Sequence, residues 1–273
     1  MFTQDETKEI INLYTNSFLS LNELSKYFNC STYIIKKVLL LNDIRIRTRA
    51  EQTRCSNMKR ALTCNNQYFS KIDSINKAWL LGFLMSDGTV RKERNEIKIG
   101  LSSIDREILE KIKEELKISR PILDYETNNG FNISQLAWTS FQQKQDLAFY
   151  GIVPNKTYLE NHLPNFDKKY KLAYILGFLD GDGSISIDKE NHLRIRFFSY
   201  RIELLEDIKN FLEETFNATS SLSKSNKRQF YELSFSTKYA SNILKEMYDL
   251  NSLRLNRKYQ KYLEWKTHET LTS

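Results

Sequence analysis

The chain has 273 residues, of which 40% are hydrophobic and 27% charged, and this balance excludes wholesale disorder and favours more than one small folded domain. A formal net charge of +7 and a pI of about 9.1 favour a polyanionic partner over small cationic substrates. Three cysteines without CxxC spacing argue against a disulfide framework or structural zinc, and neither a membrane-length apolar run nor a secretory pattern is present.

The N-terminal part of the chain contains three short apolar stripes at helical spacing, separated by turns. Ser20 and Glu23 form a capping-box pattern at the start of the second stripe. Three short helices with a tight second turn are typical of a helix-turn-helix, whose third helix enters a major groove. We predict such a domain over 1–55 and a polar linker over 56–75, with a plain helical bundle or an interaction module as the alternative. The candidate DNA contacts here are Lys36, Lys37, Arg45, Arg47 and Arg49.

The rest of the chain contains an internal repeat. LLGFLMSDG at 80–88 recurs as ILGFLDGDG at 175–183, so the last aspartates of the two copies align at an offset of 182 − 87 = 95. Downstream, LSSIDREILEKIKEEL at 101–116 aligns with FFSYRIELLEDIKNFL at 197–212 at an offset of 96. Because the offset changes by one residue, the repeat covers a whole folded unit rather than one helix.

Each copy of the repeat has the pattern of helix, hairpin, helix, hairpin and helix, and we predict the two units at 76–165 and 166–273. An apolar helix ends near Gly88 in the first unit and Gly183 in the second, where a glycine can adopt the left-handed conformation that closes a helix. The strands that follow alternate between apolar and polar residues. Each sheet is therefore expected to bury one face.

The polar face of each predicted sheet is partly basic. At the offset of 96, Lys98 aligns with Arg194, and Gly100 aligns with Arg196. The alternation alone is explained equally well by a solvated outer face and by DNA contact. If the sheets bind DNA, the candidate contacts are Arg91, Lys98, Arg194, Arg196, Lys224, Lys227 and Arg228.

LLGFLMSDG and ILGFLDGDG resemble the paired signature of the LAGLIDADG homing endonucleases, and the resemblance covers roughly residues 76–265. It implies an α+β fold of two pseudo-symmetric αββαββα subdomains, whose signature helices pack together and whose sheets form a saddle over DNA. The resemblance also implies a single-chain, monomeric enzyme that binds a long asymmetric site in double-stranded DNA. Such an enzyme cuts both strands across the minor groove and leaves short overhangs.

The residues of the two motifs suit this arrangement. Gly82 and Gly177 lie within the helices, where a missing side chain lets two backbones approach closely. Asp87 and Asp182 then lie at adjacent helix C-termini, where the carboxylates repel each other unless a cation joins them. Mg²⁺, or Mn²⁺ in its place, suits oxygen ligands and scissile phosphates. We predict catalysis by the two aspartates and metal binding by Asp87, Asp182, Ser86 and Gly181.

A basic residue commonly accompanies each catalytic site in the family, and the resemblance implies the same here. The candidates follow the last strand of each repeat: Lys156 in the first, and Arg257 or its neighbour Lys258 in the second, of which we assign Arg257. The sixth motif position is Asp180 in the second copy but Met85 in the first. We expect this difference to alter helix packing more than cleavage, and it leaves room for unequal cutting of the two strands.

The predicted function is metal-dependent, site-specific cleavage of double-stranded DNA by a homing endonuclease of a mobile intron. An RNA-binding intron maturase and a non-cleaving DNA-binding regulator are the alternatives on the same fold, and the presence of both Asp87 and Asp182 favours the enzyme. We expect no membrane partner and an intracellular location, in the cytoplasm or nucleoid of a bacterium or phage, or in the organelle that encodes the protein. Trp79, Trp138 and Trp265 are expected to be core aromatics.

Overall fold

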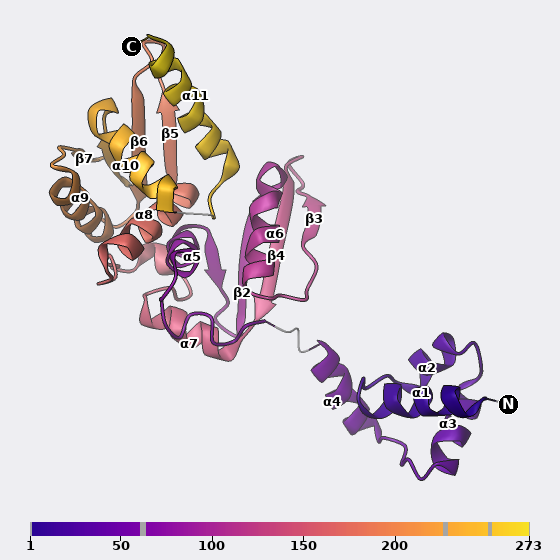
Figure 1. Cartoon of the computed structure of the whole chain (residues 1–273). Helices are drawn as coiled ribbons and strands as arrows, with labels where there is room; N and C mark the ends of the chain where they lie inside the picture. Colours follow the sequence, from indigo (N-terminus) through magenta and orange to yellow (C-terminus); the bar gives the residue numbers. More distant parts are fainter. Residues whose placement is uncertain (1, 61–63, 226–228, 251–252, 273) are drawn as a thin grey trace. The chain divides into compact units, whose positions relative to one another are not determined.

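The computed structural model describes residues 2–60, 64–225, 229–250 and 253–272, and it divides the chain into two compact units, Met1–Leu62 and Thr63–Ser273 (Figure 1). Each unit has a hydrophobic core of its own. Within the described ranges, no helix is both long enough and apolar enough to cross a membrane.

The N-terminal unit consists of helices α1 (Gln4–Thr15), α2 (Leu21–Tyr27), α3 (Thr32–Leu41) and α4 (Arg49–Arg60). The three apolar stripes converge on one small core that includes Ile10, Leu24 and Ile35. The predicted capping box is present, because the Ser20 hydroxyl accepts from the Glu23 amide while the Glu23 carboxylate accepts from the Ser20 amide. The three expected helices and the tight turn between α2 and α3 are therefore confirmed.

The second unit contains two copies of the same succession of elements. The first copy comprises α5 (Ile75–Ser86), β1 (Gly88–Val90), β2 (Glu96–Ser102), α6 (Arg106–Glu115), β3 (Leu123–Glu126), β4 (Asn132–Thr139) and α7 (Phe141–Phe149). The second comprises α8 (Lys168–Asp182), β5 (Gly183–Ile187), β6 (Leu193–Ser199), α9 (Glu203–Phe216), β7 (Ser221–Lys224), β8 (Tyr231–Phe235) and α10 (Thr237–Leu250), and α11 (Asn256–Thr272) follows it. The predicted αββαββα repeat is confirmed.

Each copy forms one four-stranded antiparallel sheet, with strand order β1-β2-β4-β3 in the first and β5-β6-β8-β7 in the second. The alternation of the strands sends Ile97, Ile99, Ile195 and Phe197 into a single core that the two copies share. Trp79, Trp138 and Trp265 are buried in this core, as expected. The opposite face of each sheet carries the polar residues.

Helices α5 and α8 pack against each other in the centre of the second unit (Figure 1). A Cβ atom on Gly82 would lie 1.9 Å from the main-chain oxygen of Tyr174, and one on Gly177 would lie 2.0 Å from that of Trp79. Only glycine fits at either crossing point, because ordinary contacts are almost twice as long. The predicted close approach of the two backbones is confirmed, and it brings the C-terminal ends of both helices together.

The predicted left-handed conformation at Gly88 and Gly183 is wrong, since φ is −115° at Gly183 and Gly88 is not among the residues with positive φ. A Cβ on Gly88 would instead lie 2.5 Å from the main-chain oxygen of Leu84, and one on Gly183 would lie 2.5 Å from that of Leu179. Both glycines are required because the chain turns from helix directly into strand with no room for a side chain.

The alignment of the two sheets differs from the predicted one by two residues. Lys98 pairs with Thr89 of β1, and Arg196 pairs with Ser184 of β5, which is at the equivalent place after the second motif. Lys98 therefore corresponds to Arg196, at an offset of 196 − 98 = 98, and not to Arg194. Because side chains in a strand alternate with a period of two, this error leaves every residue on the predicted face.

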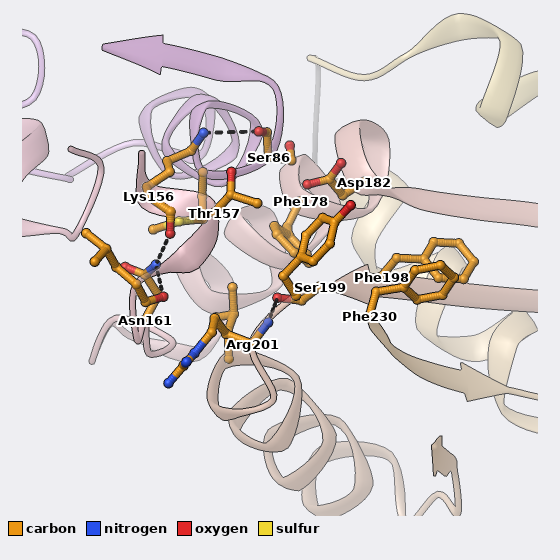
Figure 2. Close-up of a pocket in the computed structure, with 14 residues that line it drawn as sticks. Ser86, Lys156, Thr157, Asn161, Phe178, Asp182, Phe198, Ser199, Arg201 and Phe230 are labelled. Carbon is orange, nitrogen blue, oxygen red and sulfur yellow. Dashed lines mark hydrogen bonds between the residues drawn. The ribbon is translucent and has the colours of Figure 1, made fainter. Parts of the chain in front are cut away.

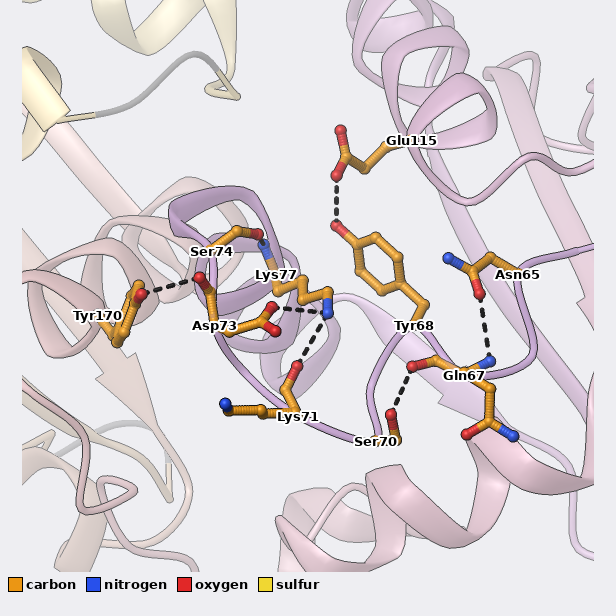
Figure 3. Close-up of polar contacts among 10 residues, drawn as sticks. All are labelled: Asn65, Gln67, Tyr68, Ser70, Lys71, Asp73, Ser74, Lys77, Glu115 and Tyr170. Atoms are coloured by element: carbon orange, nitrogen blue, oxygen red, sulfur yellow. Dashed lines mark hydrogen bonds and ion pairs between the residues drawn. The ribbon is translucent and has the colours of Figure 1, made fainter.

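Only part of the predicted linker over 56–75 is a linker. Helix α4 continues to Arg60, while Tyr68, Phe69 and Ile72 are buried in the core of the second unit. Polar contacts fix the same segment, since the Tyr68 hydroxyl donates to Glu115 at 2.9 Å and Lys77 pairs with Asp73 at 2.8 Å (Figure 3). The polar composition concealed three large apolar residues, which suffice to anchor the segment.

Candidate catalytic centres and DNA-binding surface

Asp87 and Asp182 lie at the paired C-terminal ends of the two signature helices. Asp87 caps α5 and Asp182 is the last residue of α8. Burial, and then the charge of Asp182, raise the pKa of Asp87 to about 6. Burial also raises the pKa of Asp182, although its side chain reaches the wall of an open pocket. The charges of Asp87 and Asp182 therefore lie close together at this position.

Two buried lysines occupy equivalent places beside these aspartates. Lys156 donates from Nζ to the main-chain oxygens of Ser86 and Gly88, at 3.2 and 2.5 Å. Lys258 donates to the main-chain oxygens of Gly181 and Gly183, at 3.4 and 2.7 Å. The two sets of carbonyls are related by the motif offset of 95, since 181 − 86 and 183 − 88 both equal it. The lysines are therefore the matched pair of the two repeats.

Arg257, which the sequence analysis assigned to the second centre, is occupied elsewhere. Its guanidinium forms an ion pair with Asp105 at 2.8 Å, and Asp105 is only 8% exposed. The neighbouring Lys258 is 3% exposed, and burial lowers its pKa to about 8. Lys258 thus replaces Arg257 as the partner of Lys156, because the phase of α11 turns the lysine towards the signature helices.

The charged groups form two centres that draw on both helices. The Lys156 ammonium is the largest charge that lowers the pKa of Asp182, and the Lys258 ammonium is the largest that lowers the pKa of Asp87. Asp182 shares a pocket with Lys156 and Ser86 (Figure 2), which defines one centre. Asp87 with Lys258 and the adjacent Gly181 defines the other, since a Cβ on Gly181 would lie 3.1 Å from the Asp87 carboxylate.

The donor atoms of these centres fit a hard divalent cation. In each centre a carboxylate from one helix lies near a residue of the other, Ser86 in the same pocket as Asp182 and Gly181 beside Asp87. Carboxylate oxygens are the ligands that such a cation prefers. Within the described residues, no three His, Cys, Asp or Glu side chains converge.

Asp180, at the sixth motif position of α8, is fully buried, and its charge is the largest that raises the pKa of Lys258. Its carboxylate accepts from Trp79 Nε1 at 2.9 Å and from the Leu255 amide at 3.2 Å, and burial raises its pKa to about 7. Leu255 directly precedes α11, which carries Lys258. Met85 holds the corresponding place in α5 and lines the pocket beside Lys156. The predicted difference in packing between the two copies is thus located at the contacts of Asp180 with Trp79 and Leu255.

The predicted DNA contacts of the sheets lie on their outer faces. Lys98 and Arg196 are half-buried, Arg91, Arg194 and Lys224 are exposed, and Lys227 and Arg228 lie outside the described residues. Arg196 pairs with Glu232 at 3.2 Å, and Arg91 pairs with Glu96 at 3.4 Å. The sequence analysis missed the outward-facing Phe198, which contacts Phe230 edge to face at 5.6 Å. Alternation from Arg196 was the signal that could have found it.

In the N-terminal unit, Lys36 and Lys37 are exposed on α3, and Arg45 and Arg49 are exposed in the segment after it. The Arg47 side chain, in contrast, is engaged in contacts within the unit. Its guanidinium donates to the main-chain oxygens of Tyr14 and Leu19, at 2.9 and 2.7 Å, and stacks over the Tyr14 ring. Arg47 therefore stabilises the end of α1, and its assignment as a DNA contact is not supported by its geometry.

Comparisons with known proteins agree with this architecture. A curated relative, an uncharacterized protein of Methanocaldococcus jannaschii, is 27% identical over 175 residues, and the match spans 60% of this chain and 59% of the relative. The fold is similar to that of I-WcaI, solved with its DNA recognition sequence, with a TM-score of 0.50 and 13% identity over 72% of this chain and 90% of that one.

Two further solved structures show lower similarity. The DNA-bound homing endonuclease I-LtrWI has a TM-score of 0.46 and 12% identity, covering 76% of this chain and 92% of its own. The N-terminal LAGLIDADG domain of DUF199/WhiA has a TM-score of 0.44 and 17% identity, covering 69% and 91%. The family model for the LAGLIDADG-like domain matches residues 74–135 and 169–248, just over half of the chain, and it includes both motifs. The chain therefore belongs to the family of proteins with a LAGLIDADG-like domain.

Proposed function

We propose that this protein is a site-specific endonuclease that hydrolyses both strands of double-stranded DNA with the help of Mg²⁺ or Mn²⁺. The observation that carries the proposal is the pair of centres at the helix ends, each with an aspartate and a buried lysine. Two carboxylates so close together oppose the approach of phosphates unless a cation lies between them, which favours a metal-dependent nuclease over a protein that only binds DNA.

Bound at such a centre, a divalent cation would activate water and neutralise charge on the attacked phosphate. Asp87 and Asp182 would hold the cation, with Ser86 and Gly181 beside them. The lysine ammonium groups are fixed by several carbonyls and need no reorganisation when negative charge builds up on the phosphate oxygens. Water adds to phosphorus, the P–O bond of the leaving sugar breaks, and a phosphate monoester and a hydroxyl remain.

The two sheets and the N-terminal unit would supply recognition. The outer faces carry different residues at equivalent places, such as Lys98 in the first sheet and Arg196 in the second. A single chain with two such faces suits an asymmetric site. I-WcaI binds its DNA recognition sequence with a similar fold, which supports duplex DNA as the ligand. Exposed Lys36 and Lys37 on α3 add a second basic surface.

The test is a cleavage assay on a duplex that has first been identified as a target of this protein. Candidate targets are the joined genomic flanks of the gene and duplexes recovered from a randomised library by cleavage or by binding. We expect Mg²⁺-dependent cutting that stops in Asp87→Asn and Asp182→Asn while DNA binding persists. Asp188→Asn, a substitution in the β5–β6 turn, is the matched control. A protein that selects a duplex tightly but never cuts it is a DNA-binding regulator, and preferential binding of structured RNA would indicate a maturase.

A further inference from the structure

The two centres differ in the charged residues beside their lysines. Helices α6 and α9 are equivalent, since Ile108 and Leu204, 96 residues apart, are both buried at matching places. At the same offset, Asp105 at the start of α6 corresponds to Arg201 just before α9. The sign of the charge is therefore reversed between the two copies at a position that flanks a proposed catalytic centre.

Beside Lys258, the flank is closed by an ion pair. Arg257 Nε contacts both carboxylate oxygens of Asp105, at 3.1 and 2.8 Å, so the two charges cancel. The depression next to them has a volume of about 190 Å³, and its lining includes this ion pair but neither Asp87 nor Lys258. This depression therefore gives a DNA strand no access to the aspartate or the lysine of the centre.

Beside Lys156, the flank is open. A pocket of about 220 Å³ is lined by Asp182, Ser86, Lys156 and Arg201, with aromatic rings such as Phe198 along another wall (Figure 2). Asn155 precedes Lys156 where Arg257 precedes Lys258. Arg201 pairs instead with Glu203, which is not among the residues that line the pocket, so the pocket wall presents the guanidinium without its carboxylate partner.

Arg201 has donor capacity that the protein leaves unused. Its Nη2 donates to Glu203 at 3.0 Å, whereas its Nε is buried and has no hydrogen-bond partner among the described residues. A buried donor without a partner is costly, and a guanidinium is a strong ligand for a phosphate oxygen. Figure 2 shows the Arg201 guanidinium on a different side of the pocket from Asp182.

We infer that this pocket binds a backbone phosphate of one DNA strand next to the scissile phosphate, and that the centre with Asp182 and Lys156 cuts first. The inference rests on the proposed endonuclease function. The strand at Lys156 meets two cations in the same pocket as Asp182, while the depression beside Lys258 reaches neither Lys258 nor Asp87. Cleavage then passes through a nicked duplex in which the same strand is always broken.

The experiment follows each strand separately on the selected target, with a different end label on each, under single-turnover conditions with Mg²⁺. The wild type is expected to cut one strand faster and to accumulate the nicked form on a supercoiled plasmid. Arg201→Ala should slow that strand about tenfold or more, the usual cost of a charge-assisted contact, and leave the other rate unchanged. Arg106→Ala is the matched control, because Arg106 pairs with Glu110 and Asp124 outside the pocket.

A second variant tests the closed flank. Asp105→Asn releases Arg257 and is expected to speed the slower strand, which a merely structural role of the ion pair does not predict. Equal wild-type rates on the two strands, or equal slowing of both strands by Arg201→Ala, would overturn the inference while the endonuclease function stands. A wild type that cuts no selected target refutes the proposed function itself and removes the basis of the inference.

Discussion

Replacement of Asp87 by asparagine is expected to stabilise the metal-free protein. The pKa of Asp87 is about 6, compared with 3.8 for an unperturbed aspartate, because the group is buried and lies close to the charge of Asp182. Each pH unit of that difference corresponds to about 1.4 kcal/mol, so ionised Asp87 destabilises the fold by up to about 3 kcal/mol at neutral pH. Asparagine cannot ionise, and we expect a gain of about 2–3 kcal/mol at pH 7.5 in EDTA.

The pH dependence gives this prediction its sign. Because the pKa of Asp87 is higher in the folded than in the unfolded chain, the folded protein binds more protons between pH 3.8 and about 6. The wild type therefore loses stability as pH rises through this window, and the variant does not. The advantage of Asp87→Asn should be greatest above pH 6.5, about half as large near pH 5, about a fifth as large near pH 4 and absent near pH 3.

Tryptophan fluorescence during thermal unfolding is the appropriate assay. All three tryptophans lie in the second unit, so the signal reports the unit that contains Asp87. A gain of this size corresponds to roughly 5–10 °C in Tm for a unit of this length. Asp73→Asn is the control, because the Lys77 hydrogen bond lowers the pKa of Asp73 and predicts no gain. A variant no more stable than the wild type at pH 7.5, or equally stabilised at pH 4, would refute the reasoning.

Three other substitutions test the packing and the N-terminal surface. Gly177→Ala places a Cβ 2.0 Å from a main-chain oxygen and should destabilise the second unit by about 3 kcal/mol or more in urea, whereas Gly100→Ala, with no atom within 4 Å, should stay within about 0.5 kcal/mol. Asp180→Leu leaves two buried donors unpaired and should cost about 2–5 kcal/mol by the same assay, while Asp180→Asn retains an acceptor and should cost far less. Joint replacement of Lys36 and Lys37 by alanine should reduce the slope of log K against log salt for duplex DNA by about 1.8, and an unchanged slope would contradict a role in phosphate binding.

The architecture could be predicted because each repeat shows two independent periodicities of its apolar residues, one helical and one typical of strands. Helical spacing defined the signature helices, and strict alternation placed Ile97 and Ile195 on the buried faces. Alternation fixes the face but not the register, because a shift of two residues restores the same pattern. Lys98 was therefore matched with Arg194. The pairing of Lys98 with Thr89, and of Arg196 with Ser184, shows instead that Lys98 is equivalent to Arg196.

The site could be predicted only as far as local sequence determines it. Asp87 and Asp182 were fixed by the motifs, and the packing of glycine against backbone explains why they meet. Local sequence could not decide between Arg257 and Lys258. Adjacent residues on a helix point about 100° apart, so the packing of α11, and not the sequence around it, decides which one faces the signature helices. Arg201 was missed because its role depends on a pocket formed by several distant segments.

The asymmetry of the two centres has a common structural origin in the second motif. The Asp180 carboxylate accepts from the Leu255 amide and so fixes the start of α11, from which Arg257 reaches Asp105 and Lys258 reaches the end of α8. The first motif has Met85 at this place, which forms part of the pocket wall and cannot accept such a bond. A single substitution within the repeat thus accompanies a closed flank on one side and an open one on the other. Such a division is possible only in a fused pair, because in a symmetric dimer any residue that closes one flank closes both.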